Sequence, residues 1–439
     1  MKSSMFNLVF DHQGSIYCFN TASGALLPIS GETKKIIKGK KIHTDQLSVN
    51  YPDLVKGRFF VPPETDEIKK LRFKYESQRF NTSILALTVC PTLSCNFACP
   101  YCFESPSIQQ GYMSEETINC LIQFLEAHLP SKKSLLLTWF GGEPLLGLSI
   151  IDRLSKTIIE LCEKNEVEYS SSIITNGYLL NRENAETLLA NQITRVQVTI
   201  DGTENVHNAT RSLKNGKGTF NRIITNVLCC KDILDVAIRI NLHNKNAYDM
   251  DKLIAYLAEK GLANQAYVDR VTDEAHSNRC LSCDDFTSLS IDDFSKYETR
   301  ALNVFANQRI LDRKLKPKPT FCAATTLSMF VLDPAGNIFK CWHSVGNIHE
   351  SIGNIHQESI ELNENHIDWL SYLPYDDDKC CSCICLPICQ GGCIYQKILG
   401  VKVFGECDSI RSNLVDTLRI VIDNDLNSTK LSHDNVVTC

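Results

Sequence analysis

The chain has 439 residues, of which 43% are hydrophobic and 22% are charged, and its formal net charge is −6. This length suggests two or three domains with buried cores, and the negative charge argues against nucleic acid, whose partners usually carry a basic surface. The 21 cysteines are unusual, because six of them lie between Cys380 and Cys393.

The N-terminus does not resemble a secretory signal. The apolar stretch that follows Met1 is broken at Asp11 and has no small-residue cleavage site. No segment approaches the ~20 apolar residues that a membrane helix needs. We therefore expect a cytoplasmic protein without a membrane segment, in which clustered cysteines bind metal or carry out redox chemistry more often than they form disulfides.

Residues 1–80 are expected to form a small N-terminal α+β unit. Apolar stretches at 6–10 and 15–19 flank a turn sequence, which predicts a β-hairpin. A proline pair precedes a predicted helix over 64–80, and Pro63 is suited to the start of that helix.

Residues 84–310 are expected to form the core: residues 84–270 alternate between strand and helix patterns, and residues 271–310 form a bridging segment with one further helix. Strands are predicted over 84–89, 135–140, 171–175, 195–200, 236–242 and 266–270. Helices are predicted over 115–128, 149–164, 182–191, 219–231, 248–260 and 291–306. Such alternation implies an α/β fold with a parallel sheet, because parallel strands need crossover connections. Six strands suit an open sheet or a partial barrel, and we predict a partial (β/α)6 TIM-like barrel with its chemistry at the carboxyl ends of the strands.

Residues 311–439 are rich in cysteine and poor in long periodic segments. A segment of this kind is more easily held by metal than by an apolar core. We expect it to form a separate cysteine-rich domain that binds metal.

The first cysteine group follows the first predicted strand of the α/β unit. Cys95, Cys99 and Cys102 form a C-x3-C-x2-C loop in which Tyr101 precedes the last cysteine. Three thiolates can hold three irons of a four-iron cluster, whereas ordinary electron-carrying clusters use four cysteines. The fourth iron is then open to an outside ligand, as catalytic metal sites generally are. A zinc site is the alternative interpretation.

This loop resembles the signature of radical S-adenosylmethionine (SAM) enzymes. In that family the amino and carboxylate groups of SAM chelate the open iron, and reductive cleavage of SAM yields a 5′-deoxyadenosyl radical that removes hydrogen from the substrate. Side chains alone do not supply such chemistry, so a cofactor must. The resemblance implies that Cys95, Cys99 and Cys102 are catalytic and hold the cluster, and that Tyr101 contacts the cofactor.

Further motifs at strand ends extend the resemblance. The sequence Gly141-Gly142-Glu143-Pro144 follows the second strand, and in the family such a stretch holds the SAM amino group; Glu143 can accept hydrogen bonds from an ammonium group. The remaining residues that the resemblance assigns to the cofactor are Thr175, Thr199, Asp201 and Arg239.

His207 and Arg211 complete a D-G…H…R run that begins at Asp201 and is typical of the family. The alternative is structural: Asp-Gly is a common turn, and the His and Arg would then only cap or pair locally. Arg239 would contact the SAM carboxylate or the substrate, or else solvate its own charge.

The C-terminal cysteine spacings match the seven-cysteine arrangement of the SPASM domain, an auxiliary module of many radical SAM enzymes. The resemblance assigns one auxiliary four-iron cluster to Cys322, Cys341 and Cys393, and a second to Cys380, Cys383, Cys389 and Cys407. It therefore implies three iron–sulfur clusters, one of which binds SAM.

Several cysteines depart from this arrangement. Cys381 and Cys385 are additional, and either could replace a neighbour as ligand. The first auxiliary cluster lacks a fourth ligand, which leaves an open iron for a substrate thiolate or a role for Cys280 or Cys283.

Enzymes with SPASM domains mainly act on genetically encoded peptides or proteins. Sulfatase maturases oxidise a Ser or Cys to formylglycine, and they place a catalytic Asp directly after the cysteine that corresponds to Cys341, and an eighth cysteine at the position of Ser328. In this chain Trp342 follows Cys341. We therefore favour a peptide maturase that forms thioether or carbon–carbon crosslinks, with a sulfatase-maturase-like enzyme and a non-enzymatic zinc-ribbon protein as alternatives.

The resemblance also predicts partners. These are a precursor peptide or protein as substrate and an electron donor of the flavodoxin or ferredoxin type. Peptide maturases often carry an N-terminal leader-binding domain, and residues 1–80 are either a reduced version of it or a packing extension of the core. Lysines at 34, 35, 38, 40 and 41 would attract an acidic leader or form a solvated face.

Overall fold

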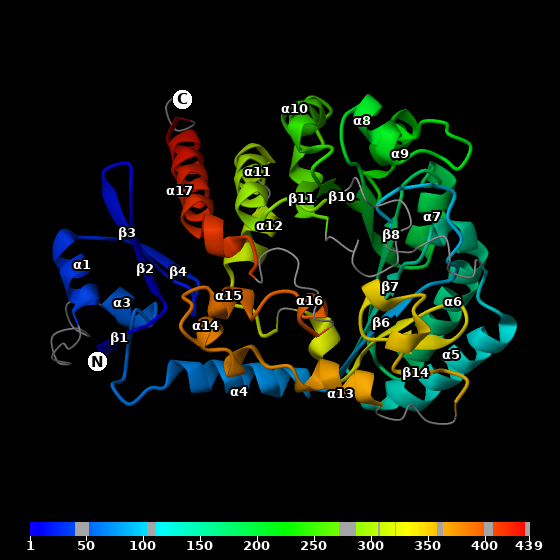
Figure 1. Ribbon diagram of the computed structural model, residues 1–439, viewed down its shortest axis with the longest axis horizontal. Coiled ribbons are helices and arrows are strands. Elements are labelled where there is room, and N and C mark those ends of the chain that lie inside the picture. Colours follow the sequence, from blue (N-terminus) through cyan, green and yellow to red (C-terminus); the bar gives the residue numbers. More distant parts are fainter. Residues whose placement is uncertain are drawn as a thin grey trace.

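The computed structural model describes residues 1–39, 52–102, 111–271, 287–305, 308–320, 322–357, 363–398 and 407–434 (Figure 1). The candidate ligands Cys280 and Cys283, as well as Lys40 and Lys41, lie outside the described residues. In the part of the chain that is described, no helix is both long and apolar enough to cross a membrane.

The N-terminal unit is a three-stranded antiparallel sheet with short helices, in the order β2-β3-β4. Its elements are β1 (Lys2–Ser3), β2 (Asn7–His12), β3 (Ser15–Asn20), β4 (Ala25–Ile29), α1 (Gly31–Lys38), α3 (Pro52–Lys56), β5 (Phe60–Val61) and α4 (Glu67–Arg79). The predicted hairpin is confirmed as β2 and β3, and its turn places Gln13 and Gly14 at φ 47° and 77°, a conformation that glycine adopts readily. The expected start of the long helix at Pro63 is wrong, because the side chain of Asp66 caps α4 by accepting from the Lys69 amide.

The core is a sheet whose six parallel strands lie in chain order, from β6 to β11. These strands are β6 (Ile84–Val89), β7 (Ser134–Trp139), β8 (Glu168–Thr175), β9 (Ile193–Thr199), β10 (Asp235–Leu242) and β11 (Ala266–Arg270). The helices of this part are α5 (Glu115–His128), α6 (Leu148–Lys164), α7 (Arg182–Ala190), α8 (Glu204–Thr210), α9 (Phe220–Cys230), α10 (Met250–Glu259) and α11 (Ile291–Phe305). The predicted α/β fold is confirmed, and the sheet is partly barrel-like without closing within the described residues.

Apolar patterning explains how these helices pack against the sheet. Helix α5, for example, buries Ile118, Leu121 and Leu125 on one face, at the spacing of an amphipathic helix. Strand β6 buries Leu85, Leu87 and Val89, so its carboxyl end is fixed where the first cysteine loop begins.

The C-terminal segment extends the same sheet. Strand β12 pairs in parallel with β6, and β13 and β14 follow in antiparallel order, which gives nine strands in all. The elements of this segment are α12 (Gln308–Leu315), β12 (Met329–Leu332), β13 (Asn337–Phe339), β14 (Gly353–Asn354), α13 (Glu364–Ser371), α14 (Asp378–Cys381), α15 (Leu386–Cys389), α16 (Tyr395–Ile398) and α17 (Ile410–Asp434). The expectation that this segment lacks long periodic elements is wrong, because α17 has 25 residues.

The two ends of the chain pack together. Phe10 and Phe19 of the N-terminal sheet share an apolar cluster with Leu414 and Leu418 of α17, and Figure 1 shows this sheet (blue) beside α17 (red). The Thr21 hydroxyl also donates to a backbone carbonyl in the C-terminal cysteine segment, at 2.5 Å. Removing residues 1–80 would therefore expose apolar side chains of α17 to water.

Phe19→Ala is expected to destabilise the protein by about 3–5 kcal/mol, the usual cost of truncating a buried Phe. The side chain is only 1% exposed and packs against α17. Thermal unfolding of the variant should show a lowered Tm. Phe73→Ala is the matched control, because Phe73 is 71% exposed, and its effect should stay within about 0.5 kcal/mol. Equal Tm values for the two variants would contradict the packing described.

Candidate active site

The Gly-Gly turn after β7 packs directly on the chain that leads into Cys95. A Cβ added at Gly141 would lie 2.3 Å from the Thr92 carbonyl oxygen, and one at Gly142 would lie 2.4 Å from the Leu93 carbonyl oxygen. Only glycine allows backbones to approach this closely. The Glu143 amide then donates to the Ser94 carbonyl at 2.9 Å, so this turn fixes the start of the cysteine loop.

Glu143 is fully buried and its carboxylate is occupied by protein donors. It accepts hydrogen bonds from the Leu145 amide at 3.0 Å, the Thr175 hydroxyl at 2.7 Å and the Asn176 amide at 2.8 Å. Burial raises the pKa of Glu143, and these donors oppose that effect. Glu143 therefore ties the end of β7 to the end of β8, with Pro144 starting a short 3-10 helix. The contact with the SAM ammonium group that the resemblance implies stays a prediction.

The end of β8 reaches the cysteine loop through Asn176. Its side-chain amide donates to Asn96 Oδ1 at 2.7 Å and lies 3.9 Å from Cys95 Sγ. The Phe97 amide also donates to Cys95 Sγ, at 3.4 Å. Asn176 belongs to the Thr175-Asn176-Gly177 stretch at this strand end, and no sequence pattern indicates its contact with the cysteine loop.

The loop cysteines are partly enclosed. Cys95 and Cys99 pack against the main core, and burial raises the pKa of Cys95 to about 12 and also raises that of Cys99. The Cys102 amide donates to the Cys99 carbonyl at 3.2 Å. Thiols in such surroundings stay protonated until a metal ion replaces the proton.

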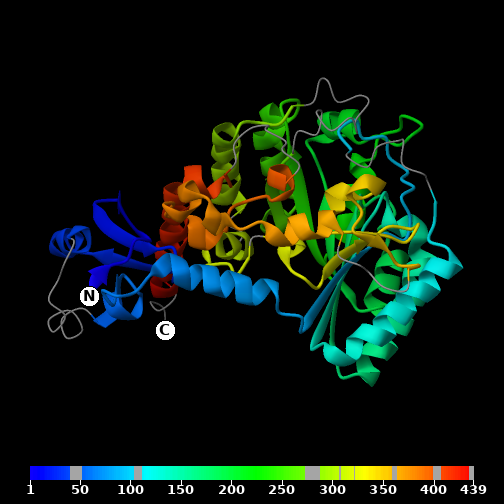
Figure 2. The same cartoon turned by 60° about the horizontal axis from the view of Figure 1, so that its bottom comes forward.

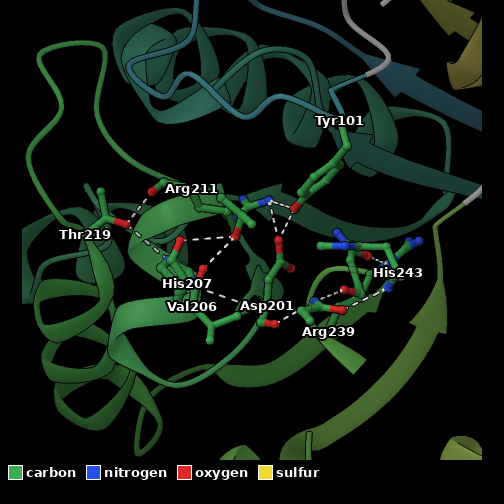
Figure 3. Close-up of polar contacts among 11 residues, drawn as sticks. Tyr101, Asp201, Val206, His207, Arg211, Thr219, Arg239 and His243 are labelled. Carbon is green, nitrogen blue, oxygen red and sulfur yellow. Dashed lines mark hydrogen bonds and ion pairs between the residues drawn. The ribbon is translucent and has the colours of Figure 1, made fainter. Parts of the chain in front are cut away.

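Tyr101 of this loop meets Asp201 and Arg211 (Figure 3). The Tyr101 hydroxyl donates to the Asp201 carboxylate, and Arg211 Nη1 donates to the Tyr101 oxygen at 2.7 Å. Asp201 Oδ1 and Arg211 Nε are buried, and among the described residues neither has a hydrogen-bond partner. Buried polar atoms without partners are costly, so the site has unused capacity for a polar ligand.

The D-G…H…R run organises the loop that carries Asp201. His207 Nδ1 accepts from the Asp201 amide at 3.2 Å, and its Nε2 lies 3.1 Å from the Thr219 hydroxyl. That hydroxyl donates to the Arg211 carbonyl at 2.6 Å. His207 therefore acts on loop structure in this arrangement, as the structural alternative expects.

The next strands add one cationic group, Arg239, and a neutral imidazole, because burial lowers the pKa of His243 to about 4. Arg239 pairs with Asp269 at 3.3 Å and donates to Asn241 Oδ1 at 2.8 Å. Thr199 is buried at the end of β9. The ring of His243, which sequence reasoning missed, lies 5.5 Å from the ring of Tyr101 (Figure 3).

Three C-terminal cysteines gather around an aromatic cluster. Cys322 and Cys341 pack with Trp369 and Tyr395, and Cys393 lies within electrostatic range of Cys322. Burial raises the pKa of Cys322. This grouping is the one that the resemblance assigns to the first auxiliary cluster, and ligation of iron stays a prediction.

Two buried cations accompany this group. Lys340 is 0% exposed and donates to the Thr326 and Met329 carbonyls at 2.6 and 2.7 Å, and Arg79 is 1% exposed. Burial lowers the pKa of Lys340 to about 7, while the nearby Cys322 opposes that effect. Neither cation forms an ion pair with a carboxylate among the described residues. Buried charges normally have a partner of opposite charge. Lys340 and Arg79 therefore suit a negatively charged group nearby, such as a thiolate-bound cluster.

The other cysteines lie between α17 and the N-terminal sheet. Cys383 and Cys389 pack at the apolar cluster that contains Phe10 and Leu414. Arg411 Nη1 donates to Cys407 Sγ at 3.1 Å. Cys380 lies within electrostatic range of Cys407, in the grouping that the resemblance assigns to the second auxiliary cluster.

The two additional cysteines have different surroundings. The Cys381 thiol donates to the Tyr375 carbonyl at 3.2 Å. Cys385 is buried, and its thiol donates to Cys383, which lowers the pKa of Cys383 to about 6. Cys385 is therefore a hydrogen-bond partner of Cys383, which the resemblance assigns as a cluster ligand.

No three Cys, His, Asp or Glu side chains in the described ranges converge on the position of one metal ion. A four-iron cluster does not require such convergence, because each thiolate binds its own iron. Together with the unpartnered Asp201 and Arg211 atoms and the buried cations near Cys322, the residues present fit the predicted cofactors.

Comparison with known proteins agrees with this arrangement. Residues 89–257 match the family described as the Radical SAM superfamily. These residues are a radical SAM domain. The predicted enzyme class is thereby confirmed, and the zinc-ribbon alternative is not supported.

Curated relatives of this radical SAM enzyme are named as maturases or synthases. A cysteine-type anaerobic sulfatase-maturating enzyme of Clostridium novyi is 24% identical, over 71% of this chain and 88% of that protein. The radical SAM cyclopropyl synthase TigE of Paramaledivibacter caminithermalis is 22% identical, over 93% of both proteins.

Solved structures share the fold. The anSMEcpe protein with bound AdoMet and Cp18Cys peptide has a TM-score of 0.61 at 20% identity, covering 79% of this chain and 99% of that one. Streptococcus suis SuiB bound to the precursor peptide SuiA has a TM-score of 0.52 at 13% identity, covering 93% and 98%. At these identities the likeness is evidence of fold alone.

Proposed function

We propose that this radical SAM enzyme oxidatively modifies a ribosomally made peptide by forming a thioether or carbon–carbon bond. The observation that carries the proposal concerns Trp342. Its ring lies 5.4 Å from that of Phe140, which directly precedes the Gly141-Gly142 turn. The position at which sulfatase maturases place a catalytic Asp is therefore aromatic, and it offers no carboxylate for oxidising a Ser or Cys side chain.

The names of similar proteins support a peptide substrate. SuiB was solved with a precursor peptide, and TigE is named as a cyclopropyl synthase. Closing a cyclopropyl ring is also formation of a carbon–carbon bond. Both comparisons extend over 93% of this chain, whereas the anSMEcpe comparison leaves 21% of it unmatched (100 − 79).

The residues of the site have distinct roles in this proposal. Cys95, Cys99 and Cys102 would hold a four-iron cluster that, with SAM bound, supplies a 5′-deoxyadenosyl radical. Asn176 orients the loop at Cys95. Asp201 and Arg211 offer unpaired polar atoms to a ligand.

The proposal includes two auxiliary clusters, on Cys322, Cys341 and Cys393 and on Cys380, Cys383, Cys389 and Cys407. It also includes a leader-binding role for residues 1–80. Through the packing of Phe19 against α17, a peptide held by this unit would be anchored to the cysteine-rich segment.

Mass spectrometry of a co-expressed precursor peptide tests the proposal. We expect a loss of two hydrogen atoms for each bond formed, because the adenosyl radical removes one hydrogen atom and the substrate then loses a proton and an electron. Fragmentation should locate the new bond between two residues or within one side chain.

A product that reacts with a hydrazide probe and contains no new bond would instead indicate formylglycine and favour the sulfatase-maturase alternative. A precursor that remains unmodified, or a product that has lost no hydrogen, would exclude both functions. A variant with Cys95, Cys99 and Cys102 replaced by Ala provides the unmodified reference.

A further inference from the structure

Helix α4 exposes aromatic and basic side chains on one face, which we call the α4 outer face. Phe73 is 71% exposed and Phe80, at the end of the helix, is 53% exposed. The other members of the face are Lys69, Lys70 and Lys74, all exposed. These residues recur at helical spacing. Large exposed aromatics beside charged residues commonly mark interaction sites.

The α4 outer face is basic in a chain whose net charge is −6. None of its three lysines forms an ion pair with another described residue. Nearby acids are already engaged: Asp66 caps the helix, and Asp376 pairs with Arg72 at 3.2 Å. Glu76 likewise pairs with Arg72, at 3.0 Å. The face is therefore left to attract a negatively charged partner.

The opposite face of α4 covers the cysteine-rich segment. Tyr75 is 0% exposed and packs with Tyr375 and the partly buried Cys380 and Cys381. Arg79 Nε donates to the Thr325 carbonyl at 3.0 Å, three positions beyond Cys322. Figure 2 shows α4 running along this segment. Because a helix with side chains is about 10–12 Å across, a partner on the outer face would lie close to these cysteines.

Ring contacts connect the surface with the interior. The Arg79 guanidinium lies 5.6 Å from the centre of the exposed Phe80 ring and 5.2 Å from that of Tyr75. The Tyr75 and Tyr375 rings are 5.5 Å apart. A continuous series of aromatic and guanidinium groups thus runs from the outer face to the helix that carries Cys380 and Cys381.

We propose that the α4 outer face is the docking surface for an acidic one-electron carrier protein of the flavodoxin type.

This inference rests on the proposed function, in which the substrate loses two hydrogens. One leaves as a hydrogen atom to the adenosyl radical. The other leaves as a proton to solvent and an electron, which passes through the cysteine-rich domain to the oxidised flavin of the carrier. Reduced carrier supplies one electron to cleave SAM, so the carrier is regenerated in each turnover.

The chemistry of the face fits such a carrier better than a peptide. Encounters between redox proteins bury little surface and are weak, and complementary charges accelerate their association. On the α4 outer face, the three lysines provide the complementary charge, and the two exposed aromatic rings provide a small contact area.

Binding of purified flavodoxin, with its FMN, to the full-length enzyme tests the proposal. A variant carrying K69E, K70E and K74E should bind about 10-fold or more weakly than wild type at low ionic strength, and salt should remove most of the difference, because the surface charges are screened. A second variant, F73A with F80A, should lose affinity at every salt concentration. The matched control carries K164E, K231E and K252E, whose lysines are exposed on core helices or directly after one, and it should bind like wild type.

Activity separates the docking surface from the proposed function. For the K69E, K70E and K74E variant, the rate of peptide modification with reduced flavodoxin should fall relative to its own rate with dithionite, whereas this ratio should stay at the wild-type value in the control variant. Unchanged flavodoxin binding would overturn the proposal, as would loss of precursor-peptide affinity alone, since the face would then bind peptide. If wild type modifies no peptide with dithionite, the proposed function fails, while the binding comparison still judges the docking surface.

Discussion

Replacing Cys95, Cys99 and Cys102 together with Ala is expected to abolish reductive cleavage of SAM. These are the three cysteines of the loop that follows β6, and in the proposed function their thiolates hold the cluster that binds SAM. Production of 5′-deoxyadenosine, measured by chromatography after reduction with dithionite, should fall to background. Iron bound through the C-terminal cysteines should remain, so the iron and sulfide content should decrease only in part.

A matched control replaces Cys120 and Cys229 with Ser. Both thiols lie outside the two cysteine patterns, and Cys229 is exposed, so 5′-deoxyadenosine production should remain at the wild-type level. Continued SAM cleavage by the triple Ala variant would show that another group of cysteines binds SAM. Complete loss of iron from that variant would mean that the C-terminal cysteines hold no independent cluster.

Much of the core fold could be predicted because hydrophobic periodicity and chain order agree in α/β proteins. The predicted strand over 266–270 and the predicted helix over 115–128 match β11 and α5. Strand β8 begins at Glu168, three residues earlier than predicted, where Glu168 pairs with Ser134 of β7. The prediction missed this start because the first residues of the strand are largely polar. Hydrophobicity alone gives no signal for such a start.

The C-terminal segment was harder to predict because its structure depends on long-range packing. The apolar residues Ile410, Leu414, Leu418 and Ile422 recur every four positions, but their pattern becomes meaningful only against the N-terminal sheet. The parallel pairing of β12 with β6 likewise joins segments that are far apart in the sequence.

At the site, the sequence indicated which residues gather but not how they pair. The types and positions of Tyr101 and Asp201 pointed to one pocket, and the structure brings them together. No sequence pattern indicates that Arg79, at the end of a surface helix, is buried against Thr325. Hydrogen-bond partners depend on tertiary geometry, and for that reason no sequence pattern indicates the three protein donors from which Glu143 accepts.

Glu143→Ala is expected to lower both the stability of the SAM-free protein and its affinity for SAM. The substitution removes the acceptor of three buried donors, from Leu145, Thr175 and Asn176, and each donor left without an acceptor costs about 1–3 kcal/mol. The ends of β7 and β8 would separate, and the cysteine loop that they hold would shift. Thermal unfolding without SAM and calorimetric titration with SAM measure the two effects.

Glu143→Gln separates positioning from direct ligand contact. The amide keeps the shape and one acceptor oxygen, but its NH2 group faces donors, so a positioning role predicts an intermediate loss of Tm without SAM. If the carboxylate instead bound the SAM ammonium group, both variants would keep the Tm of wild type, and SAM affinity alone would fall, by ~1.5–3 kcal/mol for a charged hydrogen bond. We expect the first pattern, because all three donors reach the carboxylate from the protein itself and the side chain is 0% exposed.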